Sequence, residues 1–269
     1  MKQKADKLLI YLKVWKRLTA LQFQSQIANA RAAALVFILG KLLRFLFAFA
    51  TIWVVVGRAK VIAGFTLPQA VFILTLFQLI STLTQLFFRG VYIFKQRIQD
   101  GYFDFYLLNP LSELFYSLFS YTDPLDIIML IPYGALAVWA WLNTGVSITV
   151  YSVLLLIITI GIAMLMVLAV HIAIVAIGVI YLEVDNTIML YRDLEKMSSF
   201  PIDMYGKFGS VFLTYILPLT LIATTPAKLV FQLMSPQFLL IFMGIALFQL
   251  TCSLRLWQYA LTKYSSASS

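Results

Sequence analysis

Six stretches of the chain are almost continuously apolar, near residues 32–56, 68–88, 124–142, 147–180, 208–225 and 237–257. A helix of about 20 apolar residues crosses roughly 30 Å of hydrocarbon, because each residue adds about 1.5 Å. The stretches lack the polar–apolar alternation of membrane β-barrel strands. The pattern therefore predicts six transmembrane helices.

Three of these stretches begin at typical helix-start sequences. Thr66-Leu-Pro-Gln69 resembles a capping box, and Asp123-Pro124 and Ser235-Pro236 each offer a capping side chain followed by proline. These marks favour helices over strands.

Residues 1–31 combine apolar positions at three- and four-residue spacing with basic residues between them. This pattern predicts an amphipathic helix on the inner leaflet, with its cations facing lipid head groups and its tryptophan at the interface. The residues expected to do so are Lys7, Lys13, Trp15, Lys16 and Arg17. The alternative is a cytosolic helix packed on protein.

Composition and charge fit the same interpretation. Of the 269 residues, 62% are hydrophobic and 12% charged, which excludes a single water-soluble globule. The net charge of +9 does not indicate nucleic-acid binding, because the basic residues sit at the ends of apolar runs. If the N-terminus is inside, the inside segments are 1–31, 89–123, 181–207 and 258–269. With Arg255 counted at the inner end of the last span, they hold fifteen Lys and Arg residues, against three outside, Arg58, Lys60 and Lys228. We therefore expect one all-α integral membrane domain over 1–269, multi-pass, with both termini in the cytoplasm.

Motifs for catalysis are absent from the sequence, which contains no GxxxxGK[ST], HExxH, CxxC or GxSxG. The chain is expected to be no enzyme and to hold no catalytic residue, metal site or cofactor. His171, its one histidine, is expected to be a buried, hydrogen-bonded side chain. Lys41 and Arg44 lie on one helical face; the sequence favours snorkelling to the inner interface and leaves open a place inside the bundle. No acidic residue falls in the middle of a predicted span, so a proton relay is not expected.

The inside loop 89–123 holds the most informative segment. An Asp-Gly break separates two short amphipathic pieces, and an aromatic-rich stretch and a proline follow. This arrangement favours short helices along the inner face that dock a cytosolic partner, the alternative being a membrane-covering loop with no partner. The candidate docking residues are Ile98, Asp100, Gly101, Phe103, Asp104, Leu107, Leu108 and Pro110.

The pattern Ile-x-x-Gly-x-Phe-Asp-x-x-Leu-Leu-x-Pro over 98–110 resembles the loop after the second helix in one branch of the type-2 ABC permease family. Weaker similarities lie at 62–66, 200–201, 216–218 and 225–227. Asn109 departs from the family, which usually has a basic residue before the proline. Whether this chain forms the ion pair that a basic residue would make at this position in relatives is therefore left open.

The resemblance implies a permease subunit of an ATP-driven transporter, generally an exporter. It implies that ATP and Mg are bound by ABC ATPase subunits on separate chains, and that residues about 95–115 form the coupling helix. It also implies a bacterial cytoplasmic membrane location and a dimer with a second copy or a related permease.

Two other function classes stay open from the sequence. A membrane-embedded lipid or glycan transferase would need clustered acid or histidine side chains at one interface. An ion-coupled secondary transporter would need mid-span carboxylates and inverted repeats.

Overall fold

The computed structural model describes residues 2–29, 31–59, 61, 63–123, 125–181, 184–216 and 219–265. The α-helices are α1 (Lys2–Asn29), α2 (Arg31–Ala59), α3 (Leu67–Phe88), α4 (Phe94–Gln99), α5 (Tyr102–Leu108), α6 (Glu113–Phe119), α7 (Leu125–Leu142), α8 (Val150–Tyr181), α9 (Val184–Glu195), α10 (Gly206–Val211), α11 (Thr224–Val230) and α12 (Phe238–Lys263). The connecting elements are the 3₁₀ helices η1 (Arg89–Ile93), η2 (Lys196–Ser199), η3 (Ile202–Tyr205) and η5 (Leu219–Ile222), and the π-helical turn η4 (Phe212–Ile216). No strand occurs within these ranges, which agrees with the expected all-α class.

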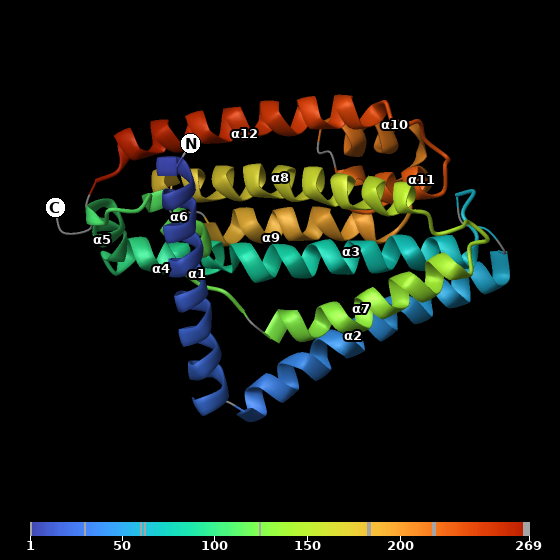
Figure 1. Cartoon of the computed structure of the whole chain (residues 1–269), viewed down its shortest axis with the longest axis horizontal. Coiled ribbons are helices and arrows are strands. Elements are labelled where there is room, and N and C mark those ends of the chain that lie inside the picture. Colours follow the sequence, from blue (N-terminus) through green and yellow to red (C-terminus); the bar gives the residue numbers. More distant parts are fainter. Residues whose placement is uncertain are drawn as a thin grey trace.

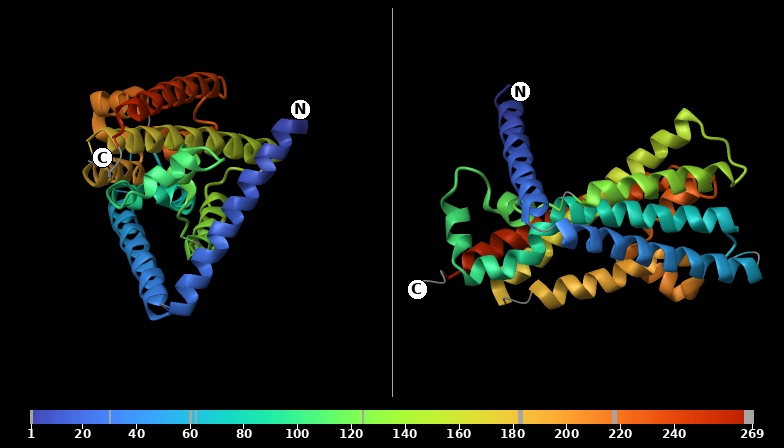
Figure 2. Two further views of the ribbon diagram at one scale, coloured as in Figure 1. Left: turned by 90° about the vertical axis from the view of Figure 1, so that its left-hand side faces the viewer. Right: turned by 90° about the horizontal axis from the view of Figure 1, so that it is seen from below.

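The long helices lie side by side along one axis (Figure 1). Helices α3, α8, α9 and α12 run along this axis, α2 and α7 lean away from α3 as a pair, and α1 crosses the bundle almost at right angles. The two turned views in Figure 2 show the same arrangement from the end and from below. Helices α4, α5 and α6 gather at one end of the bundle beside the last turns of α12. We call this the α4–α6 end.

Four of the predicted spans coincide with helices that are long and apolar enough to cross a membrane. Within the described ranges these are Leu67–Gln99, Leu125–Leu142, Val150–Tyr181 and Phe238–Lys263. The first continues from α3 through η1 into α4, eleven residues beyond the predicted end at 88. Helix α2 occupies the region predicted for the first span.

The region predicted as a continuous fifth span, 208–225, is broken instead into α10, η4, η5 and α11. Helix α9, which the sequence places in an inside loop, runs back along α8, and η2 contacts α3 (Figure 1). Asp203, expected inside, forms an ion pair of 2.7 Å with Lys228, expected outside. Helix α9 and the elements η2 and η3 are therefore part of the bundle. Their charged residues suggest a solvated segment, but Arg192, Glu195 and Lys196 line a cavity, while Asp185 and Asp193 are exposed.

Helix starts follow the local sequence. The backbone N–H of Thr66 donates to Gln69 Oε1 at 2.9 Å, which confirms the predicted capping box of α3. The N–H of Leu125 donates to Asp123 Oδ1 at 3.2 Å, so Asp123 caps α7 as predicted. Helix α12 instead begins at Phe238 after the N-cap residue Gln237, with no side-chain capping bond, so the cap predicted at Ser235 is wrong.

Candidate functional site

The turn between α4 and α5 depends on Gly101. Its φ of +74° lies in the left-handed region, which a residue without a Cβ adopts at little cost. This turn folds α5 back along α4 at the α4–α6 end, so that one face of α5 points into the protein and the other points out.

The inward face of α5 is fixed to the end of α12. Phe103 is fully buried, with its ring centroid 5.4 Å from that of Phe94 and 4.9 Å from that of Tyr264, both edge-to-face. The Tyr264 hydroxyl donates to Asp104 Oδ1 at 2.9 Å. Ile98 is buried as well. Phe103 and Ile98 therefore hold the loop in place rather than offering a docking surface, which corrects the sequence-based expectation for these two residues.

The outward face of α5 is apolar. The side chains of Tyr102, Phe105 and Leu108 are 47%, 63% and 83% exposed. The Arg97 guanidinium lies 4.7 Å from the centroid of the Tyr102 ring. We call Tyr102, Phe105 and Leu108 the α5 apolar surface. The other predicted docking residues Asp100, Leu107 and Pro110 are also exposed.

Helix α1 contacts the protein with one face and exposes cations on another. The Trp15 ring stacks on Phe87 at 5.5 Å, and Tyr11 packs edge-to-face on Phe115 at 4.8 Å while its hydroxyl accepts from the N–H of Ser112. The cations Lys13, Lys16 and Arg17 are exposed. The side chain of Lys7 lies outside the described residues. The amphipathic pattern is thus divided between a protein contact and a basic outer face.

Lys41 points into the bundle rather than to an interface. Its ammonium group forms an ion pair with Asp126, the fully buried carboxylate in the first turn of α7. Removing either partner would leave a buried charge without its counter-ion. The pair therefore ties α2 to α7. The side chain of Arg44 lies outside the described residues.

His171 is fully buried, as expected. Its Nδ1 lies 2.8 Å from the backbone carbonyl of Val167, and its ring packs on those of Phe88 and Tyr191. Among the described residues, no group of three His, Cys, Asp or Glu side chains could hold a metal ion. His171 is consequently a packing residue between α8, α3 and α9.

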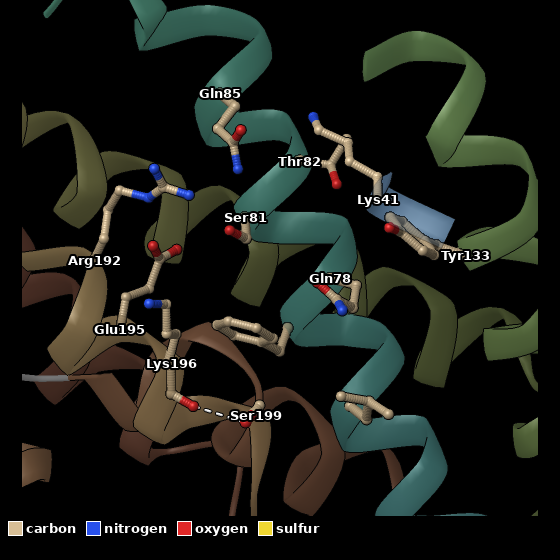
Figure 3. A pocket seen from close by; sticks show the side chains of 12 residues that line it. Lys41, Gln78, Ser81, Thr82, Gln85, Tyr133, Arg192, Glu195, Lys196 and Ser199 are labelled. Carbon is tan, nitrogen blue, oxygen red and sulfur yellow. Dashed lines mark hydrogen bonds between the residues drawn. The ribbon is translucent and has the colours of Figure 1, made fainter. Parts of the chain in front are cut away.

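A polar cavity of about 240 Å³ lies between α3 and its neighbours (Figure 3). One face of α3 lines it with uncharged polar side chains at helical spacing, Gln78, Ser81, Thr82 and Gln85. Lys41 and Tyr133 flank α3 on one side, and side chains from α9 and η2 flank it on the other. We call this space the α3–α9 cavity.

Charges gather on the α9 side of this cavity, where Arg192 and Glu195 face α3 and Lys196 lies beside them (Figure 3). Glu195 is only 4% exposed; its carboxyl group bonds the Ser81 side chain, and its Oε1 has no hydrogen-bond partner. Lys196 donates to Asp193 at 2.6 Å. A buried carboxylate oxygen with no partner is costly unless water or a ligand reaches it.

Sequence reasoning missed the α3–α9 cavity. The signal was present in α3, where polar residues recur at 78, 81, 82 and 85 in a mostly apolar helix. The α9 half could not be found in this way, because its charge density is typical of a solvated loop.

Taken together, the bundle of apolar helices defines a multi-pass membrane protein. The family described as ABC-2 family transporter protein matches residues 39–268, and the chain belongs to this family. The protein is thus an ABC transporter permease, a membrane transport subunit. No curated protein and no solved structure matches the chain.

Proposed function

We propose that this chain is the permease subunit of an ATP-driven exporter in the bacterial cytoplasmic membrane, powered by separate ABC ATPase subunits that bind ATP and Mg. The observation that carries the proposal is the α5 apolar surface, exposed on a short helix whose other face is anchored to α12. Exposed apolar side chains on a rigid support are typical of a protein contact. In a family of transport subunits, an ATPase is the partner that fits it.

The proposed topology has six spans with both termini in the cytoplasm. Helices α2, α3–α4, α7, α8 and α12 form five spans, and the broken run from α9 to α11 forms the other. The α4–α6 end is then cytoplasmic. The excess of Lys and Arg on that side remains after Arg192, Lys196 and Lys207 are reassigned to the bundle, so the charge rule still supports this orientation.

Coupling would proceed through the anchored face of α5. When ATP binding draws two ATPase subunits together, a force on the α5 apolar surface passes to α12 through Phe103, Asp104 and Tyr264. The permease must have two conformations for this coupling. Nucleotide binding shifts the equilibrium between them only as far as they differ in affinity for the ATPase. Two permease subunits, identical or related, would enclose the transport path.

The test is reconstitution of the purified permease, with the proteins that co-elute in mild detergent, into vesicles. We expect a co-eluting ATPase and transport that requires ATP hydrolysis. Reporter tags at either terminus should be accessible only from the cytoplasm. Transport without nucleotide, or a terminus outside the cell, would contradict the proposal.

An ion-coupled transporter is a second candidate, favoured by one observation. Glu195, assigned to a loop by the sequence, lies buried against α3, which provides the intrabundle carboxylate that such transporters use. The same vesicles discriminate between the two candidates. Uptake driven by a proton or sodium gradient without ATP would favour the second. Within the described residues, no cluster of His, Cys, Asp or Glu side chains favours a transferase.

A further inference from the structure

Most residues that line the α3–α9 cavity have polar side chains. Ten of its twelve lining residues carry a polar side chain, in a chain that is 62% hydrophobic. A polar cavity in apolar surroundings holds water or a polar group that satisfies its walls. Its volume is about 240 Å³. This is smaller than the pocket of a whole drug-sized ligand, so it suits a small polar group.

The charges that line the cavity define what that group must carry. Two of its three cations have their own carboxylates, since Lys41 pairs with Asp126 and Lys196 pairs with Asp193. Within the described part of the chain, neither Arg192 nor Glu195 forms an ion pair within 4.0 Å. The Arg192 charge acts on Glu195 from a longer distance, and its guanidinium lies 5.6 Å from the centroid of the Tyr92 ring. A ligand would therefore have no short ion pair to break at either residue.

A ligand with a single charge fits this pair poorly. A purely anionic group beside Arg192 would be repelled by the Glu195 carboxylate, whose Oε1 is buried and has no hydrogen-bond partner. A purely cationic group beside Glu195 would be repelled by Arg192. A group that carries both an ammonium and an anion satisfies the two residues at once.

The α3 side of the cavity supplies the remaining hydrogen bonds. Gln78 and Gln85 each present amide donors and an acceptor, and the hydroxyls of Ser81 and Thr82 can act as either. Such groups match the ester and hydroxyl oxygens that surround a charged head group. The apolar surroundings of the cavity would then accommodate acyl chains.

We propose that the α3–α9 cavity binds a zwitterionic group that joins an ammonium to a phosphate, with the ammonium on Glu195 and the phosphate on Arg192. If the chain is the exporter subunit proposed above, this chemistry describes its substrate class. The same group occurs in a zwitterionic phospholipid and in the free glycerophosphodiester, and these two sources can be separated by experiment.

Binding is measured by native mass spectrometry on the full-length permease in detergent without nucleotide. The probes are phosphatidylethanolamine, phosphatidylglycerol with the same acyl chains, and free glycerophosphoethanolamine. We expect phosphatidylethanolamine to bind about tenfold more tightly than phosphatidylglycerol, which is the effect of one charge-assisted contact. If free glycerophosphoethanolamine competes with the lipid, the polar group alone is the ligand. If it does not compete, the ligand is the whole phospholipid. Either result supports the proposal.

Two variants test the assigned residues. Glu195→Gln should abolish the preference for the zwitterionic lipid, and Arg192→Gln should weaken binding of both lipids by about tenfold. The control Asp185→Asn removes an exposed carboxylate on the same helix, paired with Lys95, and should change neither affinity. Melting temperatures establish that each variant is folded.

Equal affinity for the two lipids in the wild type would overturn the proposal, and so would an unchanged preference in folded Glu195→Gln. Because no ATPase takes part, these results are independent of ATP-driven transport. A permease that binds the zwitterion but recruits no ATPase would refute only the exporter function.

Discussion

Phe103 and Phe105 lie two residues apart in α5, and their truncation should affect two different properties of the protein. Phe103 is fully buried against the rings of Phe94 in α4, Trp257 in α12 and Tyr264 just after α12. Phe105 is 63% exposed, and among the described aromatic pairs it contacts only the Tyr102 ring, at 6.3 Å. We predict that Phe103→Ala destabilises the protein and that Phe105→Ala weakens association with the ATPase.

The expected magnitudes follow from burial. Removing a fully buried Phe side chain costs about 3–5 kcal/mol, and the edge-to-face contacts of Phe103 with Phe94 and Tyr264 favour the upper half of this range. For a domain of this size that corresponds to a melting temperature lower by about 10 °C. Phe105→Ala should shift stability by less than about 0.5 kcal/mol and lower ATPase affinity by about tenfold.

The assay measures both properties on the same preparations. Melting temperature is followed by size-exclusion chromatography of heated detergent samples, and ATPase association by affinity capture at graded ATPase concentrations. Phe119→Ala, a partly buried aromatic of α6, serves as a control for general loss of aromatic packing. If Phe103→Ala kept its melting temperature and lost the ATPase, Phe103 would contact the partner directly and the anchoring role would be refuted.

Three further predictions concern contacts elsewhere in the bundle. Lys41→Met or Asp126→Asn alone should each cost about 3–5 kcal/mol, and the double variant should recover most of the loss in a thermal-shift double-mutant cycle; additive losses would show that the pair is not coupled. Gly90→Ala should destabilise the fold by about 1–3 kcal/mol, because the new Cβ would lie 2.7 Å and 2.9 Å from two backbone carbonyl oxygens of α6. An unchanged melting temperature would contradict this packing. Trp257→Phe should cost about 1 kcal/mol by removing the 3.1 Å hydrogen bond from Nε1 to Glu113; a Glu113→Ala variant, which has no acceptor, with the stability of the wild type would show that the bond contributes little.

The sequence predicts those parts of the fold that depend on local pattern. Continuous apolar runs located α3, α7, α8 and α12, since hydropathy and length determine whether a helix can cross a bilayer. The capping box at Thr66 was recognisable because its two partners are three residues apart. The same local reasoning wrongly placed α9 in a loop outside the bundle, because its charged residues resemble those of a solvated helix. Their neighbours in α3 lie more than 100 residues earlier in the sequence.

The candidate sites were predictable to different degrees. The loop pattern identified the α4–α5 segment correctly as the place where short helices turn, yet it could not separate Phe103 from Phe105. Which of the two faces inward depends on Tyr264 and Trp257, at the far end of the chain. Likewise, Lys41 could not be placed until the distant Asp126 was seen to face it.

The interruption of the helical run between α9 and α11 has a consequence for how the bundle can deform. A continuous helix bends as a stiff rod, but each break at η2, η3 and η4 is a joint around which short rigid pieces can rotate independently. The half that contains Glu195 could therefore shift against α3 while α11 stays seated on α8. Crosslinks placed across each joint in turn would show which of them the transport cycle requires to move.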